Sequence, residues 1–258
     1  MCHEIGFLQA ILEEPDDDTH RLVYADWLEE QDDTGRAEFI RMQCARSRLP
    51  QEDPRRLEMY RREEAFLLAH ADQWLEPLRL RVGVWNFRRG FLESATLPAS
   101  AFLLHHRLLF RISTLWHLRL EPGSQTEPSS GFKGADEVAR LLASSPLLLR
   151  LDSLAFPPGD LGDAGTSILA ASAAAAGLTN LDLAQNAIGP PGARALAQGP
   201  NLSRLTWLSL DGNPVGDAGA EELLRAPWQR VGGLRVRGCG LGESMLQALR
   251  NRFQNVYS

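Results

Sequence analysis

The apolar residues in the C-terminal half of the chain follow a pattern that fits neither a simple strand nor a simple helix. In residues 178–189, LTNLDLAQNAIG, leucines stand at positions 178, 181 and 183 and an isoleucine at 188. Strand alternation spaces apolar residues by two and a helix spaces them by three or four, so neither period covers the stretch. The stretch recurs at steps of 27, 27 and 26 residues when copies are aligned on Leu154, Leu181, Leu208 and Leu234.

The aligned copies also agree around these anchor leucines. Residues three before, two after and seven after the anchor are apolar, and the residue eight after it is always glycine. Five residues after the anchor, the copies carry Gly159, Asn186, Asn213 and Cys239. A weaker copy centres on Leu118, separated from the next by an insertion at 121–134, and Leu92 fits an atypical first copy. This is the spacing L-x-x-L-x-L-x-x-N/C-x-L at a period of 26 to 27 residues.

Each part of the unit has a physical role. The leucines two apart point to one side of a short strand, into a core, and the residues between them point to the other side. We expect the amides of Asn186 and Asn213 to pair buried backbone groups in the following turn, and Cys239 and Gly159 to do this less well.

A helix is expected after each repeat's glycine, over 162–172, 189–197 and 216–224. The predicted N-caps are Asp163 and Asp217, and Pro191 suits a first helical turn. Strand plus helix in each unit predicts a curved α/β solenoid, with a parallel sheet on the concave side and helices outside. Because one unit cannot bury its apolar face alone, at least three must stack.

Residues 112–250 resemble ribonuclease-inhibitor-like leucine-rich-repeat proteins on these motifs. The resemblance implies an α/β fold, a leucine-rich-repeat solenoid, over residues 81–258. The segment LGESMLQALRNRFQNVYS at its end is expected to be a last helix and a closing cap.

The first 80 residues lack the repeat spacing and show helical patterns instead. Helices are expected over 4–14, from Asp18 or Thr19 onward, over 36–49 and over 55–78. In the second helix the candidates for burial are Leu22, Val23, Trp27 and Leu28.

The strings PDDD, RLVYADWLEE and GRAEFIRMQ lie within residues 4–46. On these strings the segment resembles the repeat-companion domain that precedes leucine-rich repeats in many bacterial proteins. The resemblance implies an N-terminal helical cap domain over residues 1–80, with no chemistry to transfer. Within it we expect Asp26 and Arg41 to form a partly buried ion pair that locks two helices together.

Composition narrows the functional classes. The net charge of −6 disfavours a nucleic-acid surface, and Lys133 is the only lysine. The three cysteines are far apart, without a C-x-x-C pair, and no secretory signal or run of 18 apolar residues is evident. The expected protein is therefore cytoplasmic, with no membrane segment, no cofactor and no metal. The acidic run 16–18 beside His20 is expected to be a solvated helix N-terminus.

The candidate site comes from strand geometry. Residues one before, one after and three after each anchor should project from the concave face, where recognition chemistry gathers in the C-terminal half. The candidate partner-binding residues are Asn180, Asp182, Trp207, Asp211, Arg235 and Arg237. A tryptophan on a rigid strand beside charges has the composition of a binding hot spot. We therefore expect a non-enzymatic scaffold that binds a protein partner there, with no catalytic residues, no small-molecule substrate and no nucleic acid.

The sequence leaves two alternative functions. The chain could recruit substrates for an enzyme system, or be a weak hydrolase, although the common phosphate-binding and hydrolase motifs are missing. Alternatively, the arginine-rich helix 46–62 could bind nucleic acid. Its arginines alternate with glutamate and aspartate, which favours a solvated, self-paired helix.

Overall fold

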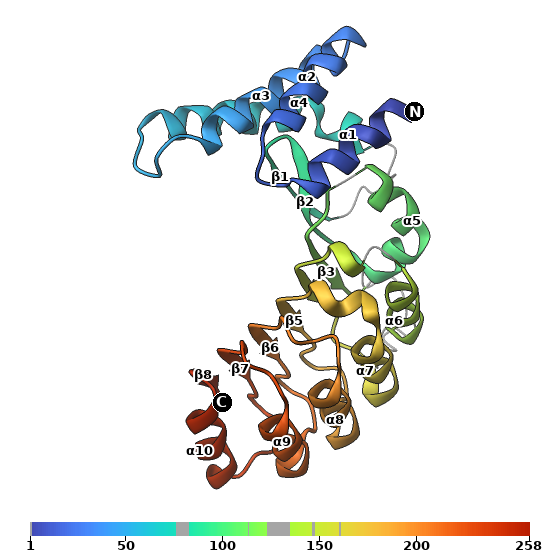
Figure 1. Cartoon of the computed structure of the whole chain (residues 1–258), viewed down its shortest axis with the longest axis vertical. Helices are drawn as coiled ribbons and strands as arrows, with labels where there is room; N and C mark the ends of the chain where they lie inside the picture. The colour runs from blue at the N-terminus through green and yellow to red at the C-terminus, as the bar shows by residue number, and fades with distance from the viewer. Residues whose placement is uncertain (1, 76–82, 113, 123–134, 146–147, 160) are drawn as a thin grey trace. The chain divides into compact units, whose positions relative to one another are not determined.

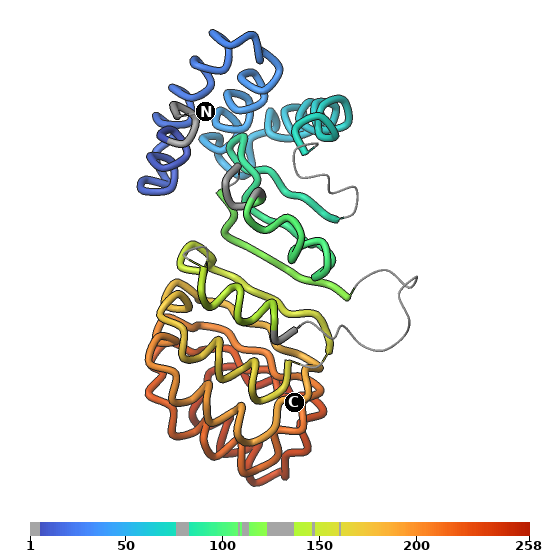
Figure 2. Tube along the Cα trace, turned by 90° about the vertical axis from the view of Figure 1, so that its right-hand side faces the viewer, coloured from blue at the N-terminus to red at the C-terminus, as the bar shows by residue number. Residues whose placement is uncertain are grey.

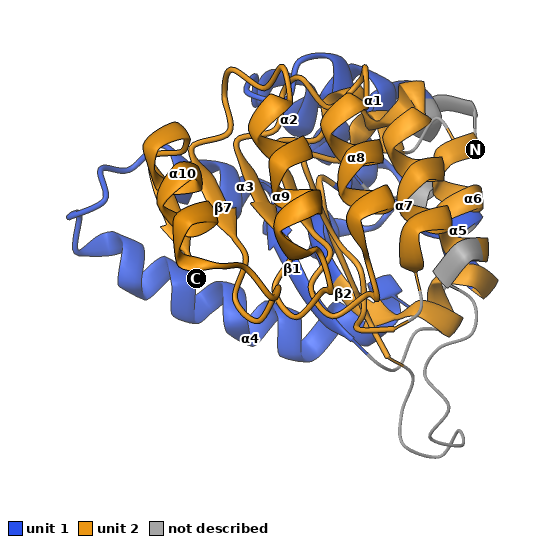
Figure 3. Ribbon diagram, turned by 90° about the horizontal axis from the view of Figure 1, so that it is seen from below, with its two compact units in different colours: residues 1–95, 105–115 blue, residues 96–104, 116–258 orange. Residues whose placement is uncertain are grey.

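The computed structural model describes residues 2–75, 83–112, 114–122, 135–145, 148–159 and 161–258. The chain forms two compact units, which Figure 3 colours separately. The first comprises residues 1–95 and 105–115, and the second residues 96–104 and 116–258.

The first unit is built from helices and a β-hairpin. Its elements are α1 (Cys2–Glu13), α2 (Thr19–Glu30), α3 (Thr34–Ser47), α4 (Arg55–Leu75), β1 (Val84–Arg88) and the start of β2 (Phe91–Pro98). All four expected helices are present, with ends within two residues of prediction except at the end of α4, where residues 76–78 lie outside the described ranges. A core of apolar side chains from α1, α2, α3 and β2 holds these elements together, and its buried members include Ile11, Ala25, Ile40 and Phe91.

Helix α2 packs with the expected face inward, apart from one residue. Leu28 is buried, and Leu22 and Trp27 are partly buried against the same core. Val23 is 48% exposed, so its predicted burial was wrong. The fully buried residues Arg21, Tyr24 and Leu28 lie three to four residues apart, which places Val23 on the far side of the helix.

A tight hairpin links β1 to β2. Both residues of its two-residue loop have positive φ, 49° at Arg89 and 87° at Gly90, which is the type I′ conformation that matches strand twist. The amide of Gly90 donates to Oε1 of the buried Gln43 on α3, at 2.7 Å. Nε2 of Gln43 in turn donates to the carbonyl of Phe87 at 3.2 Å and to Glu63 at 2.9 Å. One buried amide therefore joins α3, α4 and the hairpin.

The second unit alternates strands and helices, with the strands in one layer and the helices along their outer side (Figure 1). Its strands are β3 (His117–Glu121), β4 (Ser153–Ala155), β5 (Asn180–Asp182), β6 (Trp207–Ser209), β7 (Gly233–Arg235) and β8 (Asn255–Tyr257). Its helices after β3 are α6 (Ala135–Ser144), α7 (Gly162–Ala171), α8 (Pro190–Gln198), α9 (Gly216–Arg225) and α10 (Glu243–Arg252), with 3₁₀ turns at Leu148–Arg150 and Ala173–Gly177. Helix α5 (Ala99–Ile112) contributes residues to both units.

Strands β3 to β8 are parallel and pair in chain order, with the anchor leucines in register. Leu154 pairs with Leu181, Leu181 with Leu208, and Leu208 with Leu234, as the repeat alignment predicted. Leu118 joins the same row. Figure 2 shows the strand and helix units following one another along this part of the chain. The second unit is therefore an α/β repeat fold.

The same row extends further than the sequence pattern indicated. Val256 pairs with Leu234, so the closing segment adds a parallel strand, β8, after α10. The expected insertion at 121–134 lies almost entirely outside the described residues. None of the helices in the described ranges combines the length and apolar character needed to cross a bilayer.

The repeat asparagines pair the backbone of the turns, as predicted. Asn213 is fully buried; its Oδ1 accepts from the amides of Asn186 at 2.8 Å and Ile188 at 3.1 Å. Its Nδ2 donates to the carbonyls of Leu183 and Leu210, both at 2.8 Å. At the weaker position 239, the thiol of Cys239 donates to the Leu210 carbonyl at 3.0 Å. Asn213 thus connects two neighbouring repeats through four backbone groups.

The predicted N-caps require a correction. Asp163 and Asp217 lie inside the first turns of α7 and α9 and do not cap those helices. Oδ1 of Asp163 instead accepts from the amides of Gly189 and Gly192, both at 2.8 Å, at the start of α8. Oδ1 of Asp217 accepts from Gly242 at 2.9 Å, at the start of α10. Each aspartate therefore satisfies the free amides of the next repeat's helix, which ties adjacent repeats together.

The two cysteines with described side chains, Cys44 and Cys239, are buried free thiols. Burial raises the pKa of Cys44 to about 12 and also raises that of Cys239. Because the thiolate is the reactive form, we expect neither to react with Ellman's reagent within minutes at pH 8 in a Cys2→Ser variant. Two thiols should appear on adding denaturant; rapid reaction of the native protein would contradict the buried placement.

Candidate protein-binding site

The six predicted binding residues come together on neighbouring strands of the second unit. Asn180, Trp207 and Gly233 are register partners across β5, β6 and β7, and so are Asp182, Ser209 and Arg235. The leucines between them are buried. Because side chains alternate along a strand, these residues share the sheet face opposite the helices. Asp211 and Arg237 follow β6 and β7 by two residues.

Trp207 is half-buried, and its ring lies over Gly233 on the next strand. A Cβ built on Gly233 would come within 2.6 Å of the indole Cδ1. The tryptophan can lie across β7 only because its register partner has no side chain. This contact fixes the ring orientation and leaves part of the indole open to solvent. The sequence indicates this contact, since among the aligned repeats only the one at Leu234 has glycine at the outward position before its anchor leucine.

Asp211 is held by neighbours within the chain. Its Oδ2 lies 2.6 Å from Nη2 of Arg235, and its Oδ1 accepts from the backbone amide of Arg237 at 2.8 Å. The aspartate thereby joins the end of β6 to the chain after β7 and orients the Arg235 guanidinium. We assign Asp211 a positioning role in the site.

Asp182 and Asn180 are also engaged locally. Oδ2 of Asp182 lies 3.9 Å from Nη2 of Arg119, and its Oδ1 accepts from the Ala184 amide at 3.2 Å. Ala155 is the register partner of both Arg119 and Asp182, so this ion pair spans a small residue on the strand between them. Asn180 Nδ2 donates to the Thr179 hydroxyl at 2.8 Å. Arg119 is therefore a neighbour of the site that was not among the predicted six.

Three side chains remain available for recognition. Part of the Trp207 indole faces solvent, and the Arg235 side chain is 39% exposed although it is paired. Arg237 is exposed, and its guanidinium makes no ion pair or hydrogen bond with the residues that the structure describes. The surface thus offers an aromatic face with two guanidinium groups beside it, a combination that suits binding to a protein surface with carboxylates.

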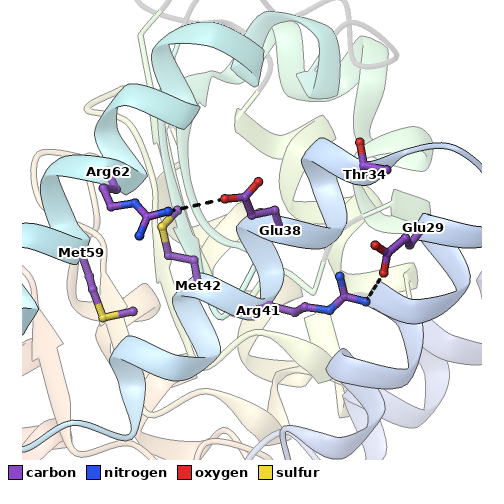
Figure 4. A pocket seen from close by; sticks show the side chains of 7 residues that line it. All are labelled: Glu29, Thr34, Glu38, Arg41, Met42, Met59 and Arg62. Atoms are coloured by element: carbon purple, nitrogen blue, oxygen red, sulfur yellow. Dashed lines mark hydrogen bonds and ion pairs between the residues drawn. The ribbon is translucent and has the colours of Figure 1, made fainter.

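A pocket of about 400 Å³ lies in the first unit between α2, α3 and α4 (Figure 4). Its charged groups pair with one another: Arg41 Nη2 lies 2.6 Å from Glu29, and Arg62 Nη2 lies 3.6 Å from Glu38. Arg41 also contacts Asp26 at 2.7 Å, which confirms the predicted pair. The Asp26 side chain is 68% exposed, however, so the expected partial burial of its carboxylate was wrong.

The arginines proposed for nucleic-acid binding are mostly engaged within the first unit. Ion pairs join Arg46 to Glu63, Arg48 to Asp18, Arg55 to Asp53 and Arg62 to Glu38, while Arg56 donates to two backbone carbonyls. Only Arg61 has no such contact among the described residues. This self-pairing agrees with the alternating charges of the segment. The single helix expected over 46–62 was wrong, however, because α3 ends at Ser47 and α4 begins at Arg55.

One group of possible metal ligands lies close together among the described residues. Ligand atoms of Glu14, Asp17 and His20 all lie within 4.8 Å of one another. His20 Nε2 lies 2.8 Å from Glu14, and Asp17 Oδ1 accepts from the Thr19 amide, which lowers the pKa of Asp17. These contacts account for the arrangement, and we assign no metal site to it.

Comparison with known proteins finds a repeat match over part of this site. A family model described as Leucine Rich repeat matches residues 178–197 and 203–224, which span β5 to α9. The matched segments contain Asn180, Asp182, Trp207 and Asp211. A comparison with curated proteins finds no match. Leucine-rich repeats generally mediate interactions between proteins, so the match supports a site of that class.

Proposed function

We propose that the protein is a non-enzymatic scaffold whose repeats bind a protein partner. In this proposal residues 81–258 form a ribonuclease-inhibitor-like solenoid, and residues 1–80 form a helical cap of the bacterial repeat-companion type. The partner lies on the concave sheet face, against Trp207, Arg235 and Arg237. Asn180, Asp182 and Asp211 border this contact and orient its charges.

The main support is the rigid placement of Trp207. The indole is held over Gly233, and the Arg235 guanidinium is held by Asp211, so both groups are ordered before a partner arrives. Ordered side chains lose little conformational entropy on binding, which favours affinity. A partly exposed tryptophan beside oriented arginines has the composition of the residues that dominate binding energies.

The partner surface should carry carboxylates around an apolar centre. The carboxylates of Asp182 and Asp211 are already paired within the chain. The Arg237 guanidinium is exposed and forms no ion pair with the described residues. The net charge exposed at this end of the sheet is therefore positive, although the whole chain carries −6. Ion pairs between these arginines and a partner's carboxylates should affect the rate of association and the orientation of the partner more than the affinity.

Replacing Trp207 and Arg237 together by alanine is expected to reduce capture of the partner at least 100-fold. Loss of one hot-spot aromatic and one charged contact costs about 3 kcal/mol or more. Affinity capture from the native host with quantitative mass spectrometry measures the change. A matched control is Gln198→Ala, an exposed substitution on α8 of the helix layer.

Capture of the same proteins by the double variant and by wild type would overturn the proposed surface. Circular dichroism of both variants checks folding, and no loss is expected because Trp207 and Arg237 lie on the sheet face, outside the buried core. The alternative of an arginine-rich nucleic-acid helix predicts salt-dependent binding to DNA or RNA. The observed pairing of five of its six arginines gives that function no support in the described residues.

A further inference from the structure

Helix α4 has an inner face that packs on the first unit and an outer face that exposes apolar residues. Its inner face includes the buried Glu63, which accepts from Gln43 and Arg46 of α3. Its outer face carries three large apolar side chains in solvent: Leu57 is 58% exposed, Tyr60 48% and Leu68 89%. A helix that only covers the first unit needs no apolar residues on its outer face. These three exposed side chains therefore suggest a binding surface.

The outer stripe has the spacing of a coiled-coil seam. Leu57, Arg61, Glu64 and Leu68 are separated by four, three and four residues, the alternation of heptad core positions. Residues at these spacings lie on one side of a helix. The order of side chains along the seam is leucine, positive, negative, leucine. Its midpoint falls between residues 62 and 63, within the 21-residue helix.

Neither charge on this stripe forms an ion pair with the residues that the structure describes. Arg61 is the one arginine of the segment 46–62 without a guanidinium contact among the described residues, and it is exposed. Glu64 is also exposed; its carboxylate interacts with the Tyr60 hydroxyl, which raises the pKa of Tyr60. A positive and a negative group therefore stand next to each other on the outer face, flanked by exposed leucines.

We propose that α4 pairs antiparallel with α4 of a second copy of the chain, forming a homodimer. A twofold axis between residues 62 and 63 places Leu57 opposite Leu68 of the second copy. The same axis places Arg61 opposite Glu64 of the second copy, and each contact occurs twice. A parallel pair would instead set arginine against arginine and glutamate against glutamate. The sequence of the stripe is thus complementary to itself in one orientation only.

A single helix pair of this length is a small interface, so we expect dissociation constants in the micromolar range. The expected dimer uses the first unit, whereas the proposed partner site lies on the repeats of the second. The two interactions can therefore be tested independently, with different substitutions in the full-length chain.

Charge reversal tests the pairing. Sedimentation equilibrium of the wild type between 1 and 100 μM, a range set by the expected micromolar affinity, should show a monomer–dimer equilibrium. Arg61→Glu and Glu64→Arg, each alone, should weaken it at least tenfold, because each places like charges in contact twice. The double variant R61E/E64R restores opposite charges and should return the dissociation constant to within about threefold of wild type. Exposed positions on a helix surface tolerate these changes, and circular dichroism verifies that they do.

Cross-linking tests the orientation. In a Cys2→Ser background, chains carrying Leu57→Cys are mixed with chains carrying Leu68→Cys under mild oxidation. The antiparallel pair predicts a disulfide-linked dimer in the mixture and little in either variant alone. A monomeric wild type at 100 μM, a dimer that both single reversals leave intact, or cross-links formed equally well by each cysteine variant alone would each overturn the proposal.

Discussion

Replacing Asn213 by alanine is expected to destabilise the second unit by about 3–5 kcal/mol. The substitution removes the two hydrogen bonds that Oδ1 of Asn213 accepts from the amides of Asn186 and Ile188. It also removes the bond that Nδ2 donates to the Leu183 carbonyl. These groups lie in the interior, where each unpaired backbone group costs about 1–3 kcal/mol. Leu210 is affected less, because its carbonyl also accepts from Cys239.

Hydrogen exchange measured by mass spectrometry on peptides from residues 178–240 gives the local opening free energies for this variant. Asn180→Ala is the matched control, since Asn180 lies on the strand face and its side-chain amide donates to the neighbouring Thr179 hydroxyl. That change should stay within about 0.5 kcal/mol of wild type. Equal protection in the two variants would show that the buried amide does not connect the repeats.

Replacing Gly90 by alanine is expected to destabilise the first unit by about 2–5 kcal/mol. Its φ of 87° disfavours any side chain, and an added Cβ would lie 2.3 Å from Cγ1 and 2.7 Å from Cα of Ile40. The second of these contacts is with the backbone of α3, which cannot rotate away. The shift would also strain the bond from the Gly90 amide to Gln43, which joins the hairpin to α3.

Gly240→Ala separates the two causes of this loss. Gly240 has a similar φ of 70°, but a Cβ there would meet nothing within 4 Å. We expect it to cost only the backbone preference, about 1–2 kcal/mol. Urea denaturation followed by hydrogen exchange of each unit measures both variants. If Gly90→Ala costs no more than Gly240→Ala, the close approach of the hairpin to Ile40 is wrong.

The sequence predicted the repeat register because the same packing contacts recur at the same positions of every repeat. Leu154, Leu181, Leu208 and Leu234 occupy one row, and the asparagine amides pair the turns as expected. Contacts that recur at one position of every repeat leave a periodic pattern in the sequence, since each copy meets the same packing requirement. The α/β repeat fold could therefore be read from spacing alone.

Side-chain bonds to the helix of the next repeat were harder to predict. Asp163 has the appearance of a cap for its own helix, yet it accepts from amides 26 and 29 residues later. Local pattern rules consider only the nearest helix start and cannot detect such a partner. The burial of Arg21 on α2 was missed for a related reason: its guanidinium donates to the carbonyl of Asp17 and lies near Glu93, far away in the chain.

The six candidate site residues were brought together by the register, but their roles were not visible in the sequence. Alternation along a strand predicted which side chains share the outer face. It could not show that Asp211 and Asp182 are paired within the chain, or that the Trp207 ring rests on Gly233. Roles of this kind depend on side-chain rotamers and neighbouring strands, which a single sequence does not specify.

Photo-crosslinking from the strand face is the most direct test of the proposed docking surface. Benzoylphenylalanine placed at position 207 or 237 should form covalent adducts with one partner protein in the native host, whereas the same group at position 198 on α8 should not. Adducts from position 198, with none from 207 or 237, would contradict the account, because the partner would then contact the helix layer of the repeats.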